Sequence, residues 1–125
     1  MSTPVTTFFN EYANALMSFS AEKISGFYHT PVTIYSEQGV MAVTDAAETV
    51  AFWKEGVKPY ETQGIVNALP KILSEEQLSG STFICKVLWN NFDGTGKEVS
   101  SETNFYILSK IKEALKISGL ILMKQ

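Results

Sequence analysis

The chain has 125 residues, of which 45% are hydrophobic, and a formal net charge of −3. This length predicts one folded domain over residues 1–125, with enough apolar residues to bury a core. All ten basic residues are lysines scattered along the chain, which excludes bidentate arginine recognition of phosphate or carboxylate. Binding to nucleic acid is therefore not expected.

The sequence also argues against a membrane partner. No apolar run approaches the roughly 20 residues that a transmembrane helix needs. Residues 1–4 show no positive region followed by an apolar segment, which a secretory signal would have. The single cysteine, Cys85, cannot form an internal disulfide. We therefore expect a cytoplasmic protein.

The first predicted element is an amphipathic helix that begins near Pro4. Thr3 can cap its N-terminus, and proline suits the first helical position. The apolar residues of this segment recur at helical spacing: Val5, Phe8, Phe9, Tyr12, Ala13 and Leu16. This stripe predicts a helix with one face on the core.

Two further helices are expected in the first half of the chain. Ser20 can cap a short second helix that Pro31 ends, and a short strand follows over residues 32–35. Asp45 and Glu48 have the spacing of a capping box and predict the start of a third helix. Its apolar stripe consists of Ala46, Val50, Trp53 and Val57, and Pro59 follows at its exit.

The second half of the chain predicts four strands, over residues 65–73, 81–92, 99–108 and 115–123. Pro70 breaks the first of them or places it at a sheet edge. The run Asp93-Gly94-Thr95-Gly96 is a strong turn signal between the second strand and the third.

The alternation of side chains on two of these strands predicts two apolar faces. Phe83, Cys85, Val87 and Trp89 share one face of their strand, opposite Ile84, Lys86, Leu88 and Asn90. On the next strand, Val99, Ser101, Thr103, Phe105 and Ile107 share a face, opposite Glu102, Asn104, Tyr106 and Leu108. We expect the helices to cover one face of the sheet. A second copy of the chain would cover the other, in a homodimer through Ile84, Leu88, Tyr106 and Leu108.

The order helix, short helix, strand, helix and four strands resembles the nuclear transport factor 2-like superfamily, which includes ketosteroid isomerases and SnoaL-like polyketide cyclases. The local matches are Glu11-Tyr12-Ala13-Asn14-Ala15-Leu16, Phe52-Trp53 and Thr103-Asn104-Phe105. The resemblance implies an α+β, cystatin-like fold. In it a cone-shaped, mixed and mostly antiparallel sheet packs on three helices of the N-terminal half. It also implies a pocket between helices and sheet, and a dimer through the outer face of the sheet.

Most of the isomerase machinery implied by this resemblance is missing. Tyr12 matches the pocket tyrosine of the isomerases, but Ser36 falls where they have the general-base aspartate. Thr103 replaces the protonated aspartate of the oxyanion hole, and Trp53 replaces a supporting tyrosine. Strong general-base catalysis is therefore not expected. A slip of one residue in this alignment would bring Glu37 or Glu102 inward.

The expected function is binding of a small apolar or aromatic molecule with one or two acceptor groups, with at most slow isomerisation or cyclisation. The predicted ligand-binding residues are Tyr12, Ser36, Trp53, Cys85, Val87, Trp89, Thr103 and Phe105. Tyr12 is the possible hydrogen-bond donor of this set, although Tyr12, Trp53 and Trp89 suit a plain core equally well.

No metal and no cofactor are expected. The only histidine, His29, lies at a helix end, and no zinc-ligand spacing is present. Cys85 has no evident base or positive neighbour and is interpreted as a small buried hydrophobe. The alternative function is a non-catalytic homodimeric interaction module, and whether the chain is an enzyme stays open.

Overall fold

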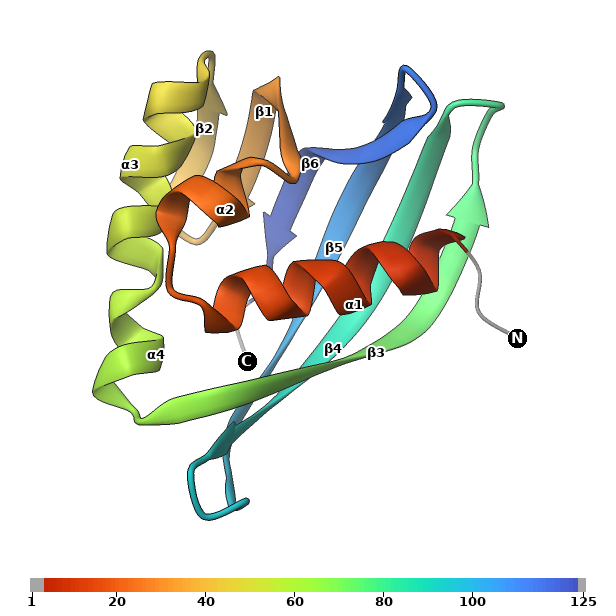
Figure 1. Cartoon of the computed structure of the whole chain (residues 1–125). Coiled ribbons are helices and arrows are strands. Elements are labelled where there is room, and N and C mark those ends of the chain that lie inside the picture. The colour runs from red at the N-terminus through yellow and green to blue at the C-terminus, as the bar shows by residue number, and fades with distance from the viewer. Residues whose placement is uncertain (1–3, 124–125) are drawn as a thin grey trace.

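A six-stranded sheet curves around the longest helix in the computed structural model, which describes residues 4–123 (Figure 1). The strand order is β2-β1-β6-β5-β4-β3. β1 and β6 run parallel, and the other neighbouring strands are antiparallel. The expected α+β class and mixed, mostly antiparallel sheet are confirmed.

The first two helices begin as the sequence predicts. α1 spans Pro4–Met17 with proline at its first position, while its expected cap, Thr3, lies outside the described residues. α2 spans Ala21–Ser25, and its cap Ser20 accepts a hydrogen bond from the Lys23 N–H at 3.2 Å. The prediction that Pro31 ends α2 is wrong, because β1 (Tyr28–Ser36) already begins before it. Pairing with β6 overrides the local helical pattern there.

The predicted cap of the third helix is confirmed in part. α3 spans Ala46–Gly56, and the Asp45 carboxylate accepts from the Glu48 N–H at 2.9 Å. The reciprocal hydrogen bond of the capping box is made one residue earlier than expected. Glu48 Oε1 accepts from the N–H and the hydroxyl of Thr44 at 3.0 and 2.6 Å. These hydrogen bonds lower the pKa of the Glu48 carboxyl.

Two short elements escape the sequence patterns. β2 (Gly39–Val43) pairs with β1 at the edge of the sheet, after a turn in which Gly39 adopts a φ of 122°. α4 (Lys58–Thr62) follows α3 directly. Pro59 therefore stands in the first turn of a new helix, where its missing N–H is tolerated, and not in an exit loop.

The four predicted strands are present. They are β3 (Ile65–Gln77), β4 (Thr82–Asp93), β5 (Glu98–Ile111) and β6 (Ala114–Leu122). β3 and β5 are longer than predicted, and β4 and β6 have the predicted length with bounds shifted by one residue. β3 lies at the edge of the sheet, which confirms the edge reading of Pro70. Asp93 closes the predicted turn by accepting from the N–H groups of Thr95 and Lys97 at 2.9 and 3.1 Å.

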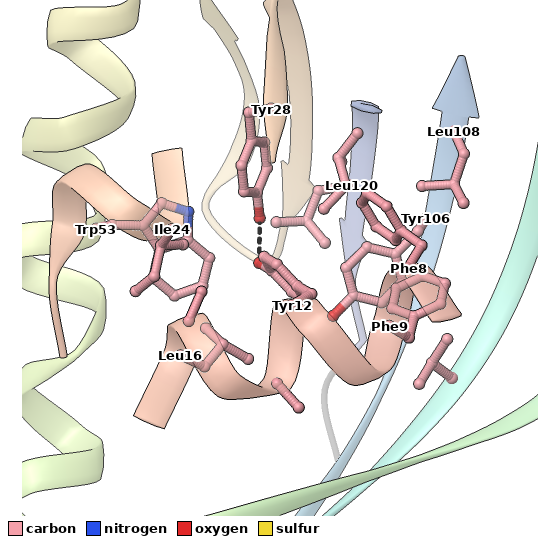
Figure 2. Packing of buried hydrophobic residues seen from close by; sticks show 14 of the residues in the cluster. Phe8, Phe9, Tyr12, Leu16, Ile24, Tyr28, Trp53, Tyr106, Leu108 and Leu120 are labelled. Carbon is pink, nitrogen blue, oxygen red and sulfur yellow. Dashed lines mark hydrogen bonds between the residues drawn. The ribbon is translucent and has the colours of Figure 1, made fainter. Parts of the chain in front are cut away.

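The core lies between the helices and the inner face of the sheet (Figure 2). Its largest fully buried side chains include Trp89, Tyr12, Phe9, Ile24, Ile65, Leu108, Ile117 and Leu120. No helix within residues 4–123 is long and apolar enough to cross a lipid bilayer.

The end of α3 offers a test of this packing. A Cβ atom at Gly56 would lie 2.8 Å from Cε3 of the buried Trp53 ring. Helix propensity alone would make Gly56→Ala stabilising by about 1 kcal/mol. Because the buried ring packs against Tyr28 and Phe52, we expect the substitution instead to lower the free energy of unfolding in urea by about 1–2 kcal/mol.

The control is Gly80→Ala, where an added Cβ meets nothing within 4 Å. Its effect should stay within about 0.5 kcal/mol. An unfolding midpoint for Gly56→Ala at or above that of the unmodified chain would show that the Trp53 ring yields.

Candidate functional site

A buried pair of tyrosine hydroxyls lies where α1 meets the sheet. The Tyr12 and Tyr28 hydroxyl oxygens are 2.6 Å apart, and both side chains are buried (Figure 2). Burial raises the pKa of Tyr12 well above its ordinary range, and the neighbouring Tyr28 adds to the effect. Burial raises the pKa of Tyr28 as well. Both hydroxyls therefore stay protonated, and they can donate a hydrogen bond but cannot act as a base.

A second polar pair lies on the inner face of the sheet. The Trp89 Nε1–H donates to the Tyr106 hydroxyl at 2.8 Å, and the Asn104 amide donates to the same oxygen at 3.5 Å. Burial also raises the pKa of Tyr106. The Trp53 ring packs against that of Tyr28, with the centroids 6.2 Å apart, and its Nε1–H has no hydrogen-bond partner among the described residues. The Tyr106 oxygen is therefore a shared acceptor in this part of the core, whereas the Trp53 indole is held by packing.

Aromatic rings pack closely around these donors. Tyr12 contacts five other aromatic rings besides Tyr28, with centroid distances from 5.5 to 6.4 Å: Phe8, Phe9, Phe27, Trp89 and Tyr106. Trp53, Cys85, Val87 and Trp89 are buried in the same core. These predicted ligand-binding residues therefore belong to the packed core that stabilises the fold.

The prediction of which β5 side chains point toward the core is wrong. Trp89 pairs with Glu102 across β4 and β5, and directly paired residues project from the same face of a sheet. Thr103 and Phe105 therefore lie on the outer face, away from Tyr12 and Trp89. Tyr106 and Leu108, which were assigned to the dimer interface, are 3% and 0% exposed inside the core.

The pairing of β5 with β4 places the Glu102 carboxylate on the inner face of the sheet. Glu102 Oε1 accepts a hydrogen bond of 2.6 Å from the hydroxyl of Tyr60, which α4 contributes. Burial and the nearby Glu102 charge both raise the pKa of Tyr60, so this hydroxyl stays the donor. Of the residues whose orientation was open, Glu102 turns inward, while Glu37 and His29 are exposed.

Two other predicted site residues have local roles. Ser36 donates to Gln38 Oε1 at 3.1 Å and accepts from the Gln38 N–H at 3.2 Å, so it shapes the turn between β1 and β2. It lines a cleft of about 260 Å³ with Phe52 and Leu122, outside the Tyr12 cluster. Burial, with a smaller contribution from Glu75, raises the pKa of the Cys85 thiol to about 11, so this cysteine remains an unreactive thiol.

A large cleft lies between α1 and the turn that joins β5 to β6. Its volume is about 620 Å³. Its residues are the apolar Pro4, Phe8, Phe27, Ala114 and Leu115 and the polar Thr7, Glu11, Gly26, Glu113 and Lys116. We refer to it as the hairpin cleft. Sequence patterns missed it because its two walls are far apart along the chain, and no motif marks either one.

The floor of the hairpin cleft rests on the buried Tyr12 ring. Phe8 stacks on Tyr12 with an interplanar angle of 13°, and Phe27 meets both rings edge-on. At the rim, Lys116 Nζ donates to the Gly26 carbonyl at 2.6 Å and ties β6 to the end of α2. Within residues 4–123, no three His, Cys, Asp or Glu side chains gather as a metal site.

Solved structures with similar folds come from several bacteria. A Nostoc punctiforme domain of unknown function with a cystatin-like fold is 15% identical, with a TM-score of 0.74 over 97% of this chain and 75% of that one. An NTF-2 like protein of unknown function from Shewanella oneidensis is 15% identical, with a TM-score of 0.72 over 94% of both chains. A candidate scytalone dehydratase from Novosphingobium aromaticivorans is 12% identical, with a TM-score of 0.64 over 97% of this chain and 81% of that one.

These similarities show that the chain has a cystatin-like α+β fold. The chain belongs to the family described as "NTF2-like protein (DUF6841)", whose model matches residues 3–124. The expected superfamily is thereby confirmed. No curated protein matches the chain by sequence.

The hydroxyl pair can be tested by a double-mutant cycle. Tyr12→Phe and Tyr28→Phe should each lower the free energy of unfolding by about 1–2 kcal/mol, because each leaves a buried hydroxyl without its partner. The double variant should cost less than the sum of the two, since no orphaned hydroxyl then remains. Urea denaturation measures all three variants.

Tyr35→Phe is the matched control, because Tyr35 is 42% exposed and makes no hydroxyl hydrogen bond to another described residue. Its effect should lie within about 0.5 kcal/mol. Strictly additive effects of Tyr12→Phe and Tyr28→Phe would contradict the pairing of the two hydroxyls.

Proposed function

We propose that this protein binds a small, largely apolar or aromatic molecule in the hairpin cleft. The observation that carries the proposal is the composition of this cleft: about 620 Å³, with Phe8, Phe27 and Leu115 as walls and polar groups at the rim. Ligand pockets are typically about 300–1,000 Å³, mostly apolar, with a few polar groups that fix orientation.

The polar rim supports a ligand with one or two acceptor groups. A lysine ammonium carries three donors, and Lys116 Nζ uses one of them on the Gly26 carbonyl. The remaining donors and the Thr7 hydroxyl are available to an acceptor on the ligand. The rim also holds Glu11 and Glu113, so its charged side chains sum to a negative charge that disfavours an anion.

Chemistry at this cleft would be weak. The buried tyrosines Tyr12 and Tyr28 stay protonated, their hydroxyls pair with each other, and neither lines the cleft. Proton abstraction would fall to Glu11 or Glu113, which are both exposed on the rim. Binding is therefore the primary role that we propose, with slow isomerisation or cyclisation as the most that these groups support.

A thermal-shift screen against small aromatic and alicyclic carbonyl compounds tests this proposal. A compound that binds the folded state stabilises it by about 2.7 kcal/mol at one hundred times its dissociation constant. Thr7→Trp should abolish the shift, because the exposed Thr7 lines the cleft and an indole there would fill it.

Ala51→Trp is the matched control, on an exposed position of α3 that does not line this cleft. It should keep the full shift of the unmodified chain. The proposal fails if no compound stabilises the unmodified protein, or if Thr7→Trp retains the shift.

We also propose that two copies of the chain pair through the outer face of the sheet. The registers align one cross-strand row on this face, consisting of Val40, Tyr35, Ile121, Phe105, Lys86 and Ser74. Ile107 and Ile84 extend it on one side, and Thr103 and Leu88 on the other. The row is apolar from Val40 to Phe105, and an apolar surface of this kind is typical of an interface. This surface supports the proposed homodimer. Its interface would contain Phe105 and Ile107, because Tyr106 and Leu108 are buried in the core.

Light scattering at micromolar concentration should show a dimer for the unmodified chain. Leu88→Lys should shift it to monomer, because the half-buried Leu88 lies within the apolar surface. Ala51→Lys adds the same charge to an exposed helix position and should leave the dimer intact. A monomeric unmodified chain would refute the pairing.

A further inference from the structure

A second groove lies on the other side of α1, against the edge strand of the sheet. Figure 1 shows α1 beside β3, and the two elements are in contact. The groove measures about 510 Å³. Its walls are Asn10, Ala13, Asn14, Met17 and Ser18 from α1 and Val66, Asn67, Ala68, Leu69 and Pro70 from β3. We refer to it as the edge groove, and it shares no residue with the hairpin cleft.

Three carboxamides give the edge groove its polar character. The side chains of Asn10, Asn14 and Asn67 are exposed, and none forms a hydrogen bond with another residue in the described part of the chain. A carboxamide offers an N–H donor and a carbonyl acceptor, as a peptide group does. Within residues 4–123, no charged side chain lines the groove. This chemistry complements an uncharged chain of amides.

The spacing of two of these amides matches an extended polypeptide. Asn10 and Asn14 lie one turn apart on the same face of α1, which separates them by about 6 Å along the helix axis. Equivalent peptide groups on one side of an extended chain recur every two residues, about 6.6–6.8 Å apart. The two carboxamides can therefore reach successive peptide groups of one extended segment.

The opposite wall offers main-chain groups and shallow apolar contacts. β3 pairs only with β4 among the described strands, so its other edge presents peptide groups that are free to pair. Val66 and Leu69 on this wall are 57% and 49% exposed. Pro70 has no N–H to donate, which confines an added strand to the stretch before it.

From these observations we infer that the edge groove binds a short, extended and uncharged segment of a partner polypeptide. The segment adds a strand to the free edge of β3 over residues 66–69. Asn10 and Asn14 hold the main chain of the segment from the side of the helix. Its side chains on the inner face lie on Met17 of α1, and those that alternate with them lie on Leu69 at the outer face.

Selection of short peptides from a phage-displayed random library against the full chain tests this inference. Peptides that bind are then measured against Asn10→Ala/Asn14→Ala. Loss of two hydrogen bonds should raise the dissociation constant by about tenfold. Alanine favours a helix more than asparagine does, so this variant should fold at least as stably as the parent. A weaker affinity cannot then be ascribed to unfolding.

Thr7→Ala/Glu11→Ala is the matched control on the same helix, because both residues line the hairpin cleft alone. It should leave peptide affinity unchanged, and it separates this site from the proposed small-molecule site. Methylation of individual peptide nitrogens should weaken binding at every second residue, as strand pairing requires. The inference is overturned if no peptide is selected, if the asparagine variant binds as tightly as the parent, or if methylation shows no alternation.

Discussion

Tyr12 connects the three parts of the core. Its ring contacts the rings of Phe8 and Phe9 on its own helix, Phe27 and Tyr28 at the start of β1, and Trp89 and Tyr106 on the sheet. Its hydroxyl oxygen lies 2.6 Å from that of Tyr28. This hydrogen bond fixes the orientation of the Tyr12 ring and how deeply it is buried. These contacts set the height and rotation of α1 above the sheet. Both grooves beside α1 follow from that placement.

Much of the fold could be predicted from local chemistry. Pro4, the Ser20 and Asp45 caps and the Asp93–Gly96 turn act through neighbours a few residues away, and each lies where its pattern indicates. β2 and α4 are short elements without a periodic pattern, and the rest of the structure stabilises them. Sequence alone therefore gave no sign of either.

Which side chains of β5 point into the core depends on the register of β5 with β4, and the sequence alone does not reveal this register. Both alternations along this strand carry large apolar side chains, so neither face is marked as the inner one, and a shift of one residue exchanges the two. Pairing with β4 resolves the choice by placing Glu102 beside Trp89. The candidate site changes with it, because Tyr106, Asn104 and a carboxylate enter the interior while Thr103 and Phe105 leave it. The clefts were beyond prediction for a related reason, since each joins segments that are distant in the chain.

The place of β6 in the sheet has a consequence for folding. β6 lies between β1 and β5, so the β1–β2 hairpin joins the remaining strands only through it. Thr33 and Ile34 pair with Gly119 and Leu120, which are more than eighty residues away along the chain. Until β6 pairs, β1 and β5 each have an open edge that could pair with another extended chain. The insertion of β6 therefore removes two exposed edges in one step and joins the two parts of the sheet.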